Sequence, residues 1–371
     1  MKNIFITFFI LLTLIFASSF GFIVYKENQY ILPDNTQIRS VTDSIRFSSS
    51  FIRETKLKDL QGINSQNVKF NAWIPSWAMD SGIRSFEENK TRFSSISPVF
   101  YVMQEDGSIN TNTNGLQKLQ TAVAGTNVKL VPTISSFDPQ ALSINLNNPT
   151  KLNNFLIDEV TKNNYDGLDL NYESTYLKDK DAFFSHLKFL STELKKRGKV
   201  FYVTVLSKWG DNINYGFAPE TRKVQDYSEI AKYTDQIRIM TYDFTSQGSA
   251  NAGPIAPIEW MERVLVYATN RVPPAKLSLG VNLYGYFWNG IDAKATALDY
   301  KQIAEIINLN SSPDTFYSEK NQESTLKYIG TNGKTYFGYY SSPKSIQARI
   351  DLAAKYGVTS VAFWRLGNDP L

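Results

Sequence analysis

The stretch DGLDLNYE, at residues 166–173, decides the fold of this chain. Successive side chains of a strand point to opposite faces, so a strand here places Asp169, Asn171 and Glu173 together on one face. A surface strand with a solvated acidic edge would also fit the pattern. Helix-like segments on both sides of the stretch favour instead a central strand that is buried on both faces. Polar groups that point into a core are costly to desolvate, which indicates that these three have a function.

Seven other short apolar runs alternate with amphipathic segments from residue 68 onward. This alternation is typical of repeated βα units around a parallel sheet. Apolar residues at helical spacing predict helices in the intervening segments. The eight expected strands are 68–74, 98–103, 129–134, 167–172, 200–206, 236–242, 277–284 and 360–364.

Eight parallel strands with interleaved helices close most economically as an α/β fold, the (β/α)8 or TIM barrel, whose reactive groups lie at the C-terminal ends of strands. An open doubly wound sheet is the alternative, and it usually carries a glycine-rich phosphate loop after its first strand. Residues 72–77 read AWIPSW and contain no glycine. The sequence therefore favours the barrel.

The connection after the seventh strand is unusually long, because about 75 residues separate Tyr284 from Ser360. Within it, residues 298–308 have helical spacing. The dipeptide Asn332-Gly333 between two apolar runs is a strong signal for a two-residue hairpin. We therefore expect a small α+β insertion at about residues 288–342, between strand seven and the last helix, where it would wall one side of a cleft.

The start of the chain predicts export. Lys2 precedes an apolar stretch at residues 4–24 that would span about 31 Å as a helix, roughly one bilayer core. This stretch reads as a retained membrane anchor, although Ala17 and Ser19 form a small-x-small pattern that would suit a cleaved signal peptide. We assign residues 1–24 to one of these two. Residues 25–66 read as a stem, and 67–371 as the barrel, outside the membrane.

The composition excludes several classes of chemistry. The 39 Lys and Arg residues against 35 Asp and Glu leave a net charge of +4, too weak and too scattered for a nucleic-acid partner. Cysteine is absent, and His186 is the single histidine, so thiol nucleophiles and sites with several histidines are excluded. His186 is expected to be structural. We expect neither a cofactor nor a metal, and chemistry falls to carboxylates, tyrosines and amides.

Other strands are expected to bring candidate substrate-binding side chains to the same rim. The sixth strand ends in MTYD at residues 240–243, where Met240, Tyr242 and Asp243 are candidates and a core tyrosine near a turn is the plain alternative. The eighth strand ends at Trp364, whose flat ring would either pack in the core or stack against a pyranose ring. The first and seventh strands add weaker candidates, namely Trp73, Trp77, Asn282, Tyr284 and Tyr286.

In this order, the residues resemble glycoside hydrolase family 18, the chitinases and their relatives, whose fourth strand carries Asp-Gly-x-Asp-x-Asp-x-Glu. The resemblance runs from residue 68 to the end of the chain. MTYD at 240–243 and LGVNLYG at 279–285 look like the sixth-strand and seventh-strand motifs of the family. The end of the chain, at 356–367, resembles the branch of spore-cortex-lytic N-acetylglucosaminidases and similar exported bacterial proteins.

The resemblance implies hydrolysis of a β-1,4-linked N-acetylglucosamine polymer by substrate-assisted retention, an exception to the scheme with two catalytic carboxylates. Glu173 would protonate the glycosidic oxygen and later act as a base. The substrate's own 2-acetamido oxygen would attack the anomeric carbon. Tyr242 would hydrogen-bond the acetamido oxygen, Asp243 would help to orient the acetamido group, and Trp364 would floor the subsite.

Two departures from the family pattern stand out. Asn171 replaces the third Asp, which in the family holds the acetamido N–H and offsets the positive charge that develops there, whereas Asp169 and Glu173 keep the family's residue types. An amide oxygen can accept the same hydrogen bond without supplying charge, a loss of about 3 kcal/mol, or roughly 10²- to 10³-fold in rate. We therefore expect a slow enzyme. Residues 133–137, TISSF, stand where many members have Ser-x-Gly-Gly.

The leading hypothesis is a glycosidase that acts outside the cell membrane on peptidoglycan glycan strands or on chitin, with no preference predicted between the two polymers. The alternative is a chitinase-like glycan-binding protein in which the lost charge at Asn171 has stopped turnover. A barrel enzyme of other chemistry is the third possibility. Neither endo or exo cleavage nor an oligomeric state is predicted from these features.

Overall fold

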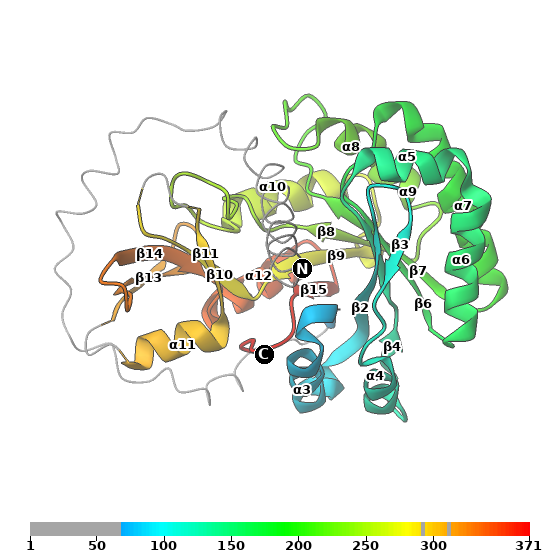
Figure 1. Cartoon of the computed structure of the whole chain (residues 1–371). Helices are drawn as coiled ribbons and strands as arrows, with labels where there is room; N and C mark the ends of the chain where they lie inside the picture. The colour runs from blue at the N-terminus through cyan, green and yellow to red at the C-terminus, as the bar shows by residue number, and fades with distance from the viewer. Residues whose placement is uncertain (1–67, 291–293, 310–312) are drawn as a thin grey trace, which may run out of the picture.

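The computed structural model describes residues 68–290, 294–309 and 313–371. Eight parallel strands close into a barrel that helices surround (Figure 1). Neighbouring strands follow the order β1-β15-β9-β8-β7-β6-β5-β2, and the pairing of β1 with β2 closes the ring. The predicted (β/α)8 barrel is confirmed. Its strands are β1 Lys69–Pro75, β2 Phe93–Met103, β5 Thr133–Ser136, β6 Gly167–Tyr172, β7 Val200–Leu206, β8 Gln236–Met240, β9 Leu277–Asn282 and β15 Ser360–Trp364.

Some of the helices begin where the sequence supplies a capping side chain. The Asp138 side chain accepts a backbone N–H of the first turn of α5 (Pro139–Asn147) at 2.7 Å, and Ser342 does the same for α12 (Pro343–Lys355) at 3.3 Å. Proline is the first residue of both helices, where its missing N–H costs nothing. The other helices around the barrel are α3 Met79–Asn89, α4 Leu116–Val123, α6 Pro149–Lys162, α7 Lys180–Lys196, α8 Pro219–Val224, α9 Tyr227–Ile230 and α10 Ile258–Thr269.

Strand β6 contains most of the stretch that decides the fold, and it lies between β5 and β7. Leu168, Leu170 and Tyr172 belong to the main hydrophobic core. Asp169, on the opposite face, is 0% exposed and points into the barrel. The alternative of a solvated surface strand is therefore excluded.

Strand β2 begins at Phe93, five residues before the expected start at residue 98. The serine-rich segment before residue 98 lacks the apolar alternation by which strands are recognised. Ser95 and Ser97 are nevertheless 0% exposed, because they face the barrel interior and accept hydrogen bonds from Arg238 at 2.9 and 2.7 Å. In this part of β2, buried hydrogen bonds to Arg238 thus take the place of apolar packing on the inner face.

Three other expected strands end two residues away from their predicted ends. The segment expected at 129–134 is divided into β4 (Lys129–Leu130) and β5, with Pro132, which has no N–H for a strand ladder, between them. The segment expected at 277–284 ends at Asn282 in the barrel, and Tyr284 opens a strand of a second sheet. The segment expected at 236–242 ends at Met240.

The second sheet forms an α+β lobe beside the barrel, drawn in yellow to orange in Figure 1. Its five antiparallel strands follow the order β11-β10-β14-β13-β12. Helix α11 (Tyr300–Leu309) packs on one face through a core that includes Phe287, Ile303 and Leu326. Gly333, at φ +73°, turns between β13 and β14. The strands are β10 Tyr284–Trp288, β11 Thr296–Asp299, β12 Asp314–Ser318, β13 Glu323–Ile329 and β14 Thr335–Tyr340.

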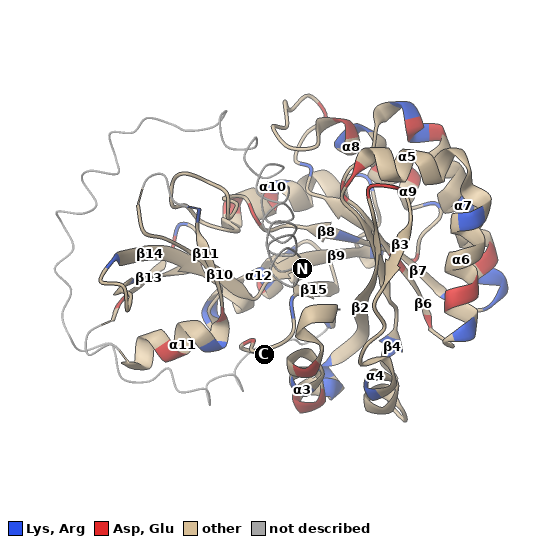
Figure 2. Ribbon diagram, in the orientation of Figure 1, with Lys and Arg blue, Asp and Glu red and all other residues tan. Residues whose placement is uncertain are grey.

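Charged side chains are mixed over the outside of the barrel. Figure 2 shows Lys and Arg interspersed with Asp and Glu along the outer helices, without a face of one sign in this view. The expected anchor or signal segment (1–24) and stem (25–66) lie outside the described residues. Among the residues that are described, no helix is both long and apolar enough to cross a membrane.

Candidate active site

A buried carboxylate, Asp169, lies inside the barrel. Its Oδ2 accepts hydrogen bonds from Trp73 Nε1 at 2.9 Å and from Thr133 Oγ1 at 2.8 Å. Its Oδ1 accepts one from Thr204 Oγ1 at 2.9 Å. These donors come from β1, β5 and β7, so Asp169 ties together three strands of the barrel. Such donors are what a buried carboxylate needs in place of water.

The same carboxylate faces a buried guanidinium group. Arg238 Nη1 lies 3.5 Å from Asp169 Oδ2, and both side chains are 0% exposed. The guanidinium also lies 4.4 Å from the ring centre of Tyr202. Our sequence reasoning missed Arg238, although a charged residue between Ile237 and Ile239 in an expected interior strand was an available signal. The interior charge of Asp169 is therefore offset by Arg238.

Asn171 and Glu173 form the next layer, toward the C-terminal rim. Asn171 Nδ2 donates a hydrogen bond to Glu173 Oε1 at 2.8 Å. Glu173 directly follows β6 and is partly exposed. Asn171 Oδ1 is buried and has no hydrogen-bond partner among the described residues. Since a buried acceptor without a partner is costly, Asn171 is suited to take an N–H from a ligand.

Tyr242 and Asp243 lie just beyond the end of β8, after Thr241. Burial raises the pKa of Tyr242 well above its ordinary value, and the charges of Glu173, Asp243 and Asp169 act in the same direction. The phenol therefore keeps its proton and remains a hydrogen-bond donor. Glu173, which follows β6, is thus among the charged groups that act on this hydroxyl after β8.

Asp243 is held by two tyrosines of the lobe. The hydroxyl groups of Tyr284 and Tyr286 both donate to its carboxylate. Burial raises the pKa of Asp243 to about 6, although these two hydrogen bonds act to lower it. Its backbone is left-handed, at φ +59°. Tyr286 was only a weak sequence candidate, and the lobe thus contributes directly to the site.

Tryptophan side chains line the rim at the ends of β1 and β15. The ring centres of Trp73 and Trp364 lie 6.1 Å apart, and those of Trp77 and Trp364 lie 6.5 Å apart. Trp73 is 2% exposed, whereas Trp77 is 72% exposed. Trp364 is partly exposed. Trp73 therefore serves the interior, through its bond to Asp169, whereas the other two leave ring surface exposed at the rim.

The last two candidates are Asn282, which is buried, and Met240, which is partly exposed. Asn282 is 0% exposed and pairs in register with Trp364, and its Nδ2 donates to the backbone oxygen of Tyr284 at 3.2 Å. Its Oδ1 has no hydrogen-bond partner among the described residues. Met240 is the last residue of β8, pairs with Leu206 of β7 and is partly exposed.

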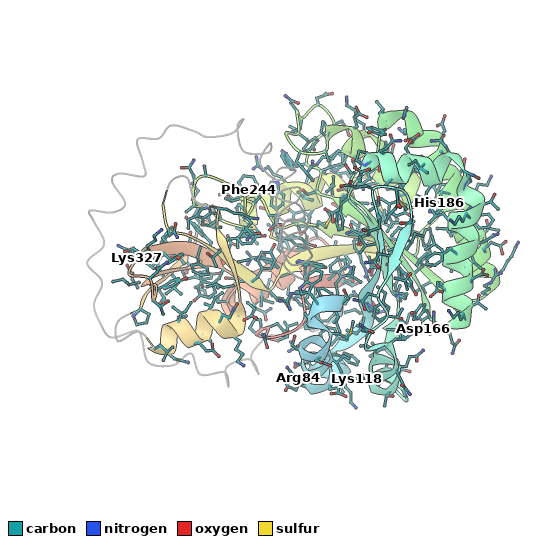
Figure 3. All side chains as sticks on the ribbon, in the orientation of Figure 1. Arg84, Lys118, Asp166, His186, Phe244 and Lys327 are labelled. Carbon is teal, nitrogen blue, oxygen red and sulfur yellow. The ribbon has the colours of Figure 1, made fainter. Side chains whose placement is uncertain are left out.

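His186 takes no part in this arrangement. Its Nδ1 lies 2.6 Å from Asn153 Oδ1 and its Nε2 lies 3.2 Å from the hydroxyl of Tyr172. Burial lowers the pKa of His186 to about 3, so the ring is neutral at physiological pH. His186 belongs to α7, and Figure 3 shows it away from Phe244, the residue after Asp243. Within the described residues, no group of three or more His, Asp and Glu side chains could hold a metal ion.

Known proteins are similar to this chain in sequence and in fold. The family model described as "Glycosyl hydrolases family 18" matches residues 39–369. The uncharacterized glycosylase YvbX of Bacillus subtilis (strain 168) is 25% identical over 241 residues, which cover 64% of this chain and 68% of that protein. The cortical fragment-lytic enzyme of Bacillus anthracis is 24% identical over 275 residues, which cover 71% of this chain and 62% of that protein.

The fold is also similar to the crystal structure of a chitinase from Chromobacterium violaceum, with a TM-score of 0.73 and 19% identity over 81% of this chain and 95% of that one. The chain matches less than two thirds of the length of the cortical fragment-lytic enzyme. The family match, by contrast, covers most of the chain, including the barrel and the motif at residues 166–173. The chain therefore belongs to glycosyl hydrolases family 18.

Proposed function

We propose that this protein hydrolyses glycans that contain β-1,4-linked N-acetylglucosamine, with retention of configuration and with the substrate's acetamido oxygen as the nucleophile. The observation that carries the proposal is Glu173, placed directly after β6 with Asn171 at 2.8 Å and Tyr242 nearby. Glu173 protonates the glycosidic oxygen as the bond breaks. It then takes a proton from the water that opens the cyclic intermediate.

The acetamido group of such a substrate needs a donor for its oxygen and an acceptor for its N–H. The Tyr242 hydroxyl is the donor, since its raised pKa keeps it protonated. Asn171 Oδ1, a buried acceptor with no partner among the residues described, receives the N–H. Asp243, held by Tyr284, orients the group from the side of the lobe. Holding the nucleophile near the anomeric carbon in this way lowers the entropic cost of the attack.

The charge arrangement supports slow turnover. Asn171 is neutral, and the charge of Asp169 is offset by Arg238. The positive charge that develops on the acetamido group therefore meets less negative charge than an Asp at position 171 would provide. The loss of one such preorganised contact corresponds to roughly 10²- to 10³-fold in rate.

Two polymers fit this chemistry. The relationship to a cortical fragment-lytic enzyme supports a peptidoglycan substrate, and the partly exposed rings of Trp364 and Trp77 can stack on either polymer. We propose further that the apolar segment at residues 4–24, with Lys2 before it, places the protein outside the cytoplasmic membrane, anchored or secreted. A glycan outside the membrane would then be within its reach.

The test uses the purified full chain with N-acetylglucosamine oligomers and, separately, with peptidoglycan. Mass spectrometry detects cleavage, and NMR reads the anomer of the first product. We expect slow release of products whose new reducing end has the β configuration, and release slower by a further factor of about 10² to 10⁴ in Glu173→Gln. An initial α product would exclude the retaining mechanism, and no product from either polymer would exclude hydrolysis of this class.

A glycan-binding protein without turnover is the second candidate, and the neutral Asn171 is the observation that favours it. Calorimetry with the same oligomers separates the two. Binding by the full chain without any product would support the binding protein. Binding accompanied by product would support the hydrolase, however slow the release.

A further inference from the structure

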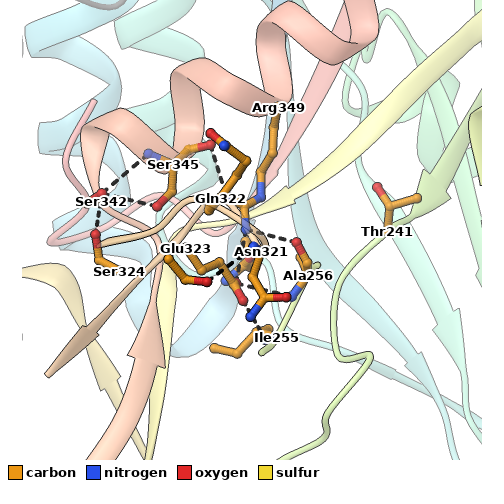
Figure 4. A network of polar contacts seen from close by, with 12 residues as sticks. Thr241, Ile255, Ala256, Asn321, Gln322, Glu323, Ser324, Ser342, Ser345 and Arg349 are labelled. Atoms are coloured by element: carbon orange, nitrogen blue, oxygen red, sulfur yellow. Dashed lines mark hydrogen bonds and ion pairs between the residues drawn. The ribbon is translucent and has the colours of Figure 1, made fainter. Parts of the chain in front are cut away.

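A buried ion pair joins the lobe to the last helix of the barrel. Arg349 of α12 donates from Nη2 to Oε1 of Glu323, the first residue of β13, at 2.9 Å (Figure 4). Both side chains are 0% exposed. Arg349 also donates to the backbone oxygens of Gln322 and Ser345, at 3.1 and 2.8 Å. Arg349 is thus bonded both to the lobe and to its own helix.

The same pair holds the loop between β8 and α10. Glu323 accepts the backbone N–H of Ile255 at 2.9 Å on Oε2 and that of Ala256 at 3.1 Å on Oε1. Arg349 donates to the backbone oxygen of Ala256 at 3.1 Å. Both polar groups of the Ala256 backbone are therefore bound by one carboxylate and one guanidinium, as Figure 4 shows.

This loop leads directly to the site. Ile255 accepts a hydrogen bond on its backbone oxygen from the N–H of Phe244 at 2.8 Å. Phe244 is the residue after Asp243. The side chain of Ile255 is buried in a small cluster with Tyr286, and Tyr242 packs against that cluster. One continuous set of contacts therefore runs from Arg349 through Glu323 and Ile255 to Tyr242 and to Phe244, the neighbour of Asp243.

We infer that Glu323, held by Arg349, is a positioning residue for Tyr242 and Asp243. It touches no substrate and acts through the loop. Burying two charges costs desolvation free energy, and apolar residues of similar volume are often as stabilising as a buried ion pair. The pair is therefore better explained by the loop geometry that it imposes than by stability alone. The inference rests on the proposed function, since the positioned residues are those that bind the acetamido group.

The experiment compares three variants of the full chain. Glu323→Ala removes both acceptors. Glu323→Gln keeps the shape with one acceptor oxygen, so that one of the two loop N–H groups loses its partner. Glu319→Gln is the matched control, because Glu319 pairs with Lys344 at 2.7 Å on the exposed surface of the same lobe. Amide hydrogen exchange over residues 243–257 is measured together with the melting temperature and with kcat and KM.

The inference is supported if amide exchange in residues 243–257 is faster by about tenfold or more in Glu323→Gln. This is the effect of leaving one buried N–H without a partner. We expect the larger effect in Glu323→Ala and none in Glu319→Gln. Turnover of N-acetylglucosamine oligomers should fall in the same order, whereas binding of deacetylated glucosamine oligomers stays constant, because only the acetamido contacts are disturbed. A structural role alone would weaken the binding of both kinds of oligomer equally.

Unchanged exchange in residues 243–257 of Glu323→Gln would overturn the inference, and so would an equal loss of binding for acetylated and deacetylated oligomers. The exchange measurement needs no substrate. If the unmodified chain cleaves no glycan, the proposed function fails, and the exchange data still decide whether Glu323 holds the loop.

Discussion

Asn171 directs its Nδ2 to Glu173 Oε1 at 2.8 Å and leaves its own Oδ1 buried without a partner among the described residues. The amide thus makes one contact, to the Glu173 carboxyl, and keeps an acceptor that an acetamido N–H of the proposed substrate can use. An aspartate at this position would bring a negative charge instead of the N–H donor. The replacement therefore trades electrostatic stabilisation for an orienting hydrogen bond to Glu173.

Substitution of Asn171→Asp should raise the turnover number by roughly 10²-fold if charge at this position is what limits the rate. The affinity for N-acetylglucosamine oligomers should change little, because the aspartate oxygen still accepts the acetamido N–H. Kinetics at several pH values and calorimetry measure the two quantities. A loss of turnover would show instead that Asn171 is tuned for the native substrate.

Substitution of Glu173→Gln should lower the turnover number by about 10²- to 10⁴-fold, the usual contribution of a general acid or base. Binding of the oligomers should remain, since the amide has nearly the same shape. Glu87→Gln, on the exposed surface of α3, is the control and should behave as the unmodified chain. Retained turnover in Glu173→Gln would point to another chemistry.

Arg238 is expected to be essential for stability. Arg238→Met leaves Asp169 charged and buried without its cation, at a cost of about 3–5 kcal/mol in the free energy of unfolding. The double variant Arg238→Met with Asp169→Asn should recover part of the loss. Urea unfolding measures each value. The exposed pair of Lys118 and Asp80 provides the control, and Lys118→Met should leave the unfolding midpoint nearly unchanged.

Asp243 predicts a pH dependence of stability. Its pKa is raised to about 6 in the folded protein from an ordinary value of 3.8, so the folded state binds the proton more tightly than the unfolded chain. The stabilisation from this group is complete below about pH 4 and declines as the pH rises through about 6. Asp243→Asn should make that decline shallower. Urea unfolding in steps from about pH 4 to pH 7 tests this, and equal slopes for the two proteins would contradict it.

The fold could be predicted because its signals are local. Strand and helix periodicities alternate along the chain, and the two-residue period of a strand was enough to predict the polar face of residues 166–173. Glu173, Tyr242 and Trp364 were placed at one rim by the rule that parallel strands of a barrel end on the same side, and each lies at or just after the end of its strand.

The polar interior could not be predicted in the same way. Arg238 contacts Asp169 and Ser97, which lie far from it in the chain, so local periodicity contains no trace of either contact. The pairing of Glu323 with Arg349 is similarly remote, because it joins the lobe to the last helix. Only closure of the barrel and docking of the lobe bring these groups together.

A single residue, Leu283, separates barrel strand β9 from lobe strand β10. Such a short join leaves little slack for the two parts to rock independently. In addition, Glu323 of the lobe accepts a hydrogen bond from the loop after β8. Protein engineers who wish to transplant the lobe onto another barrel would therefore have to move residues 243–257 and α12 with it, as one cassette.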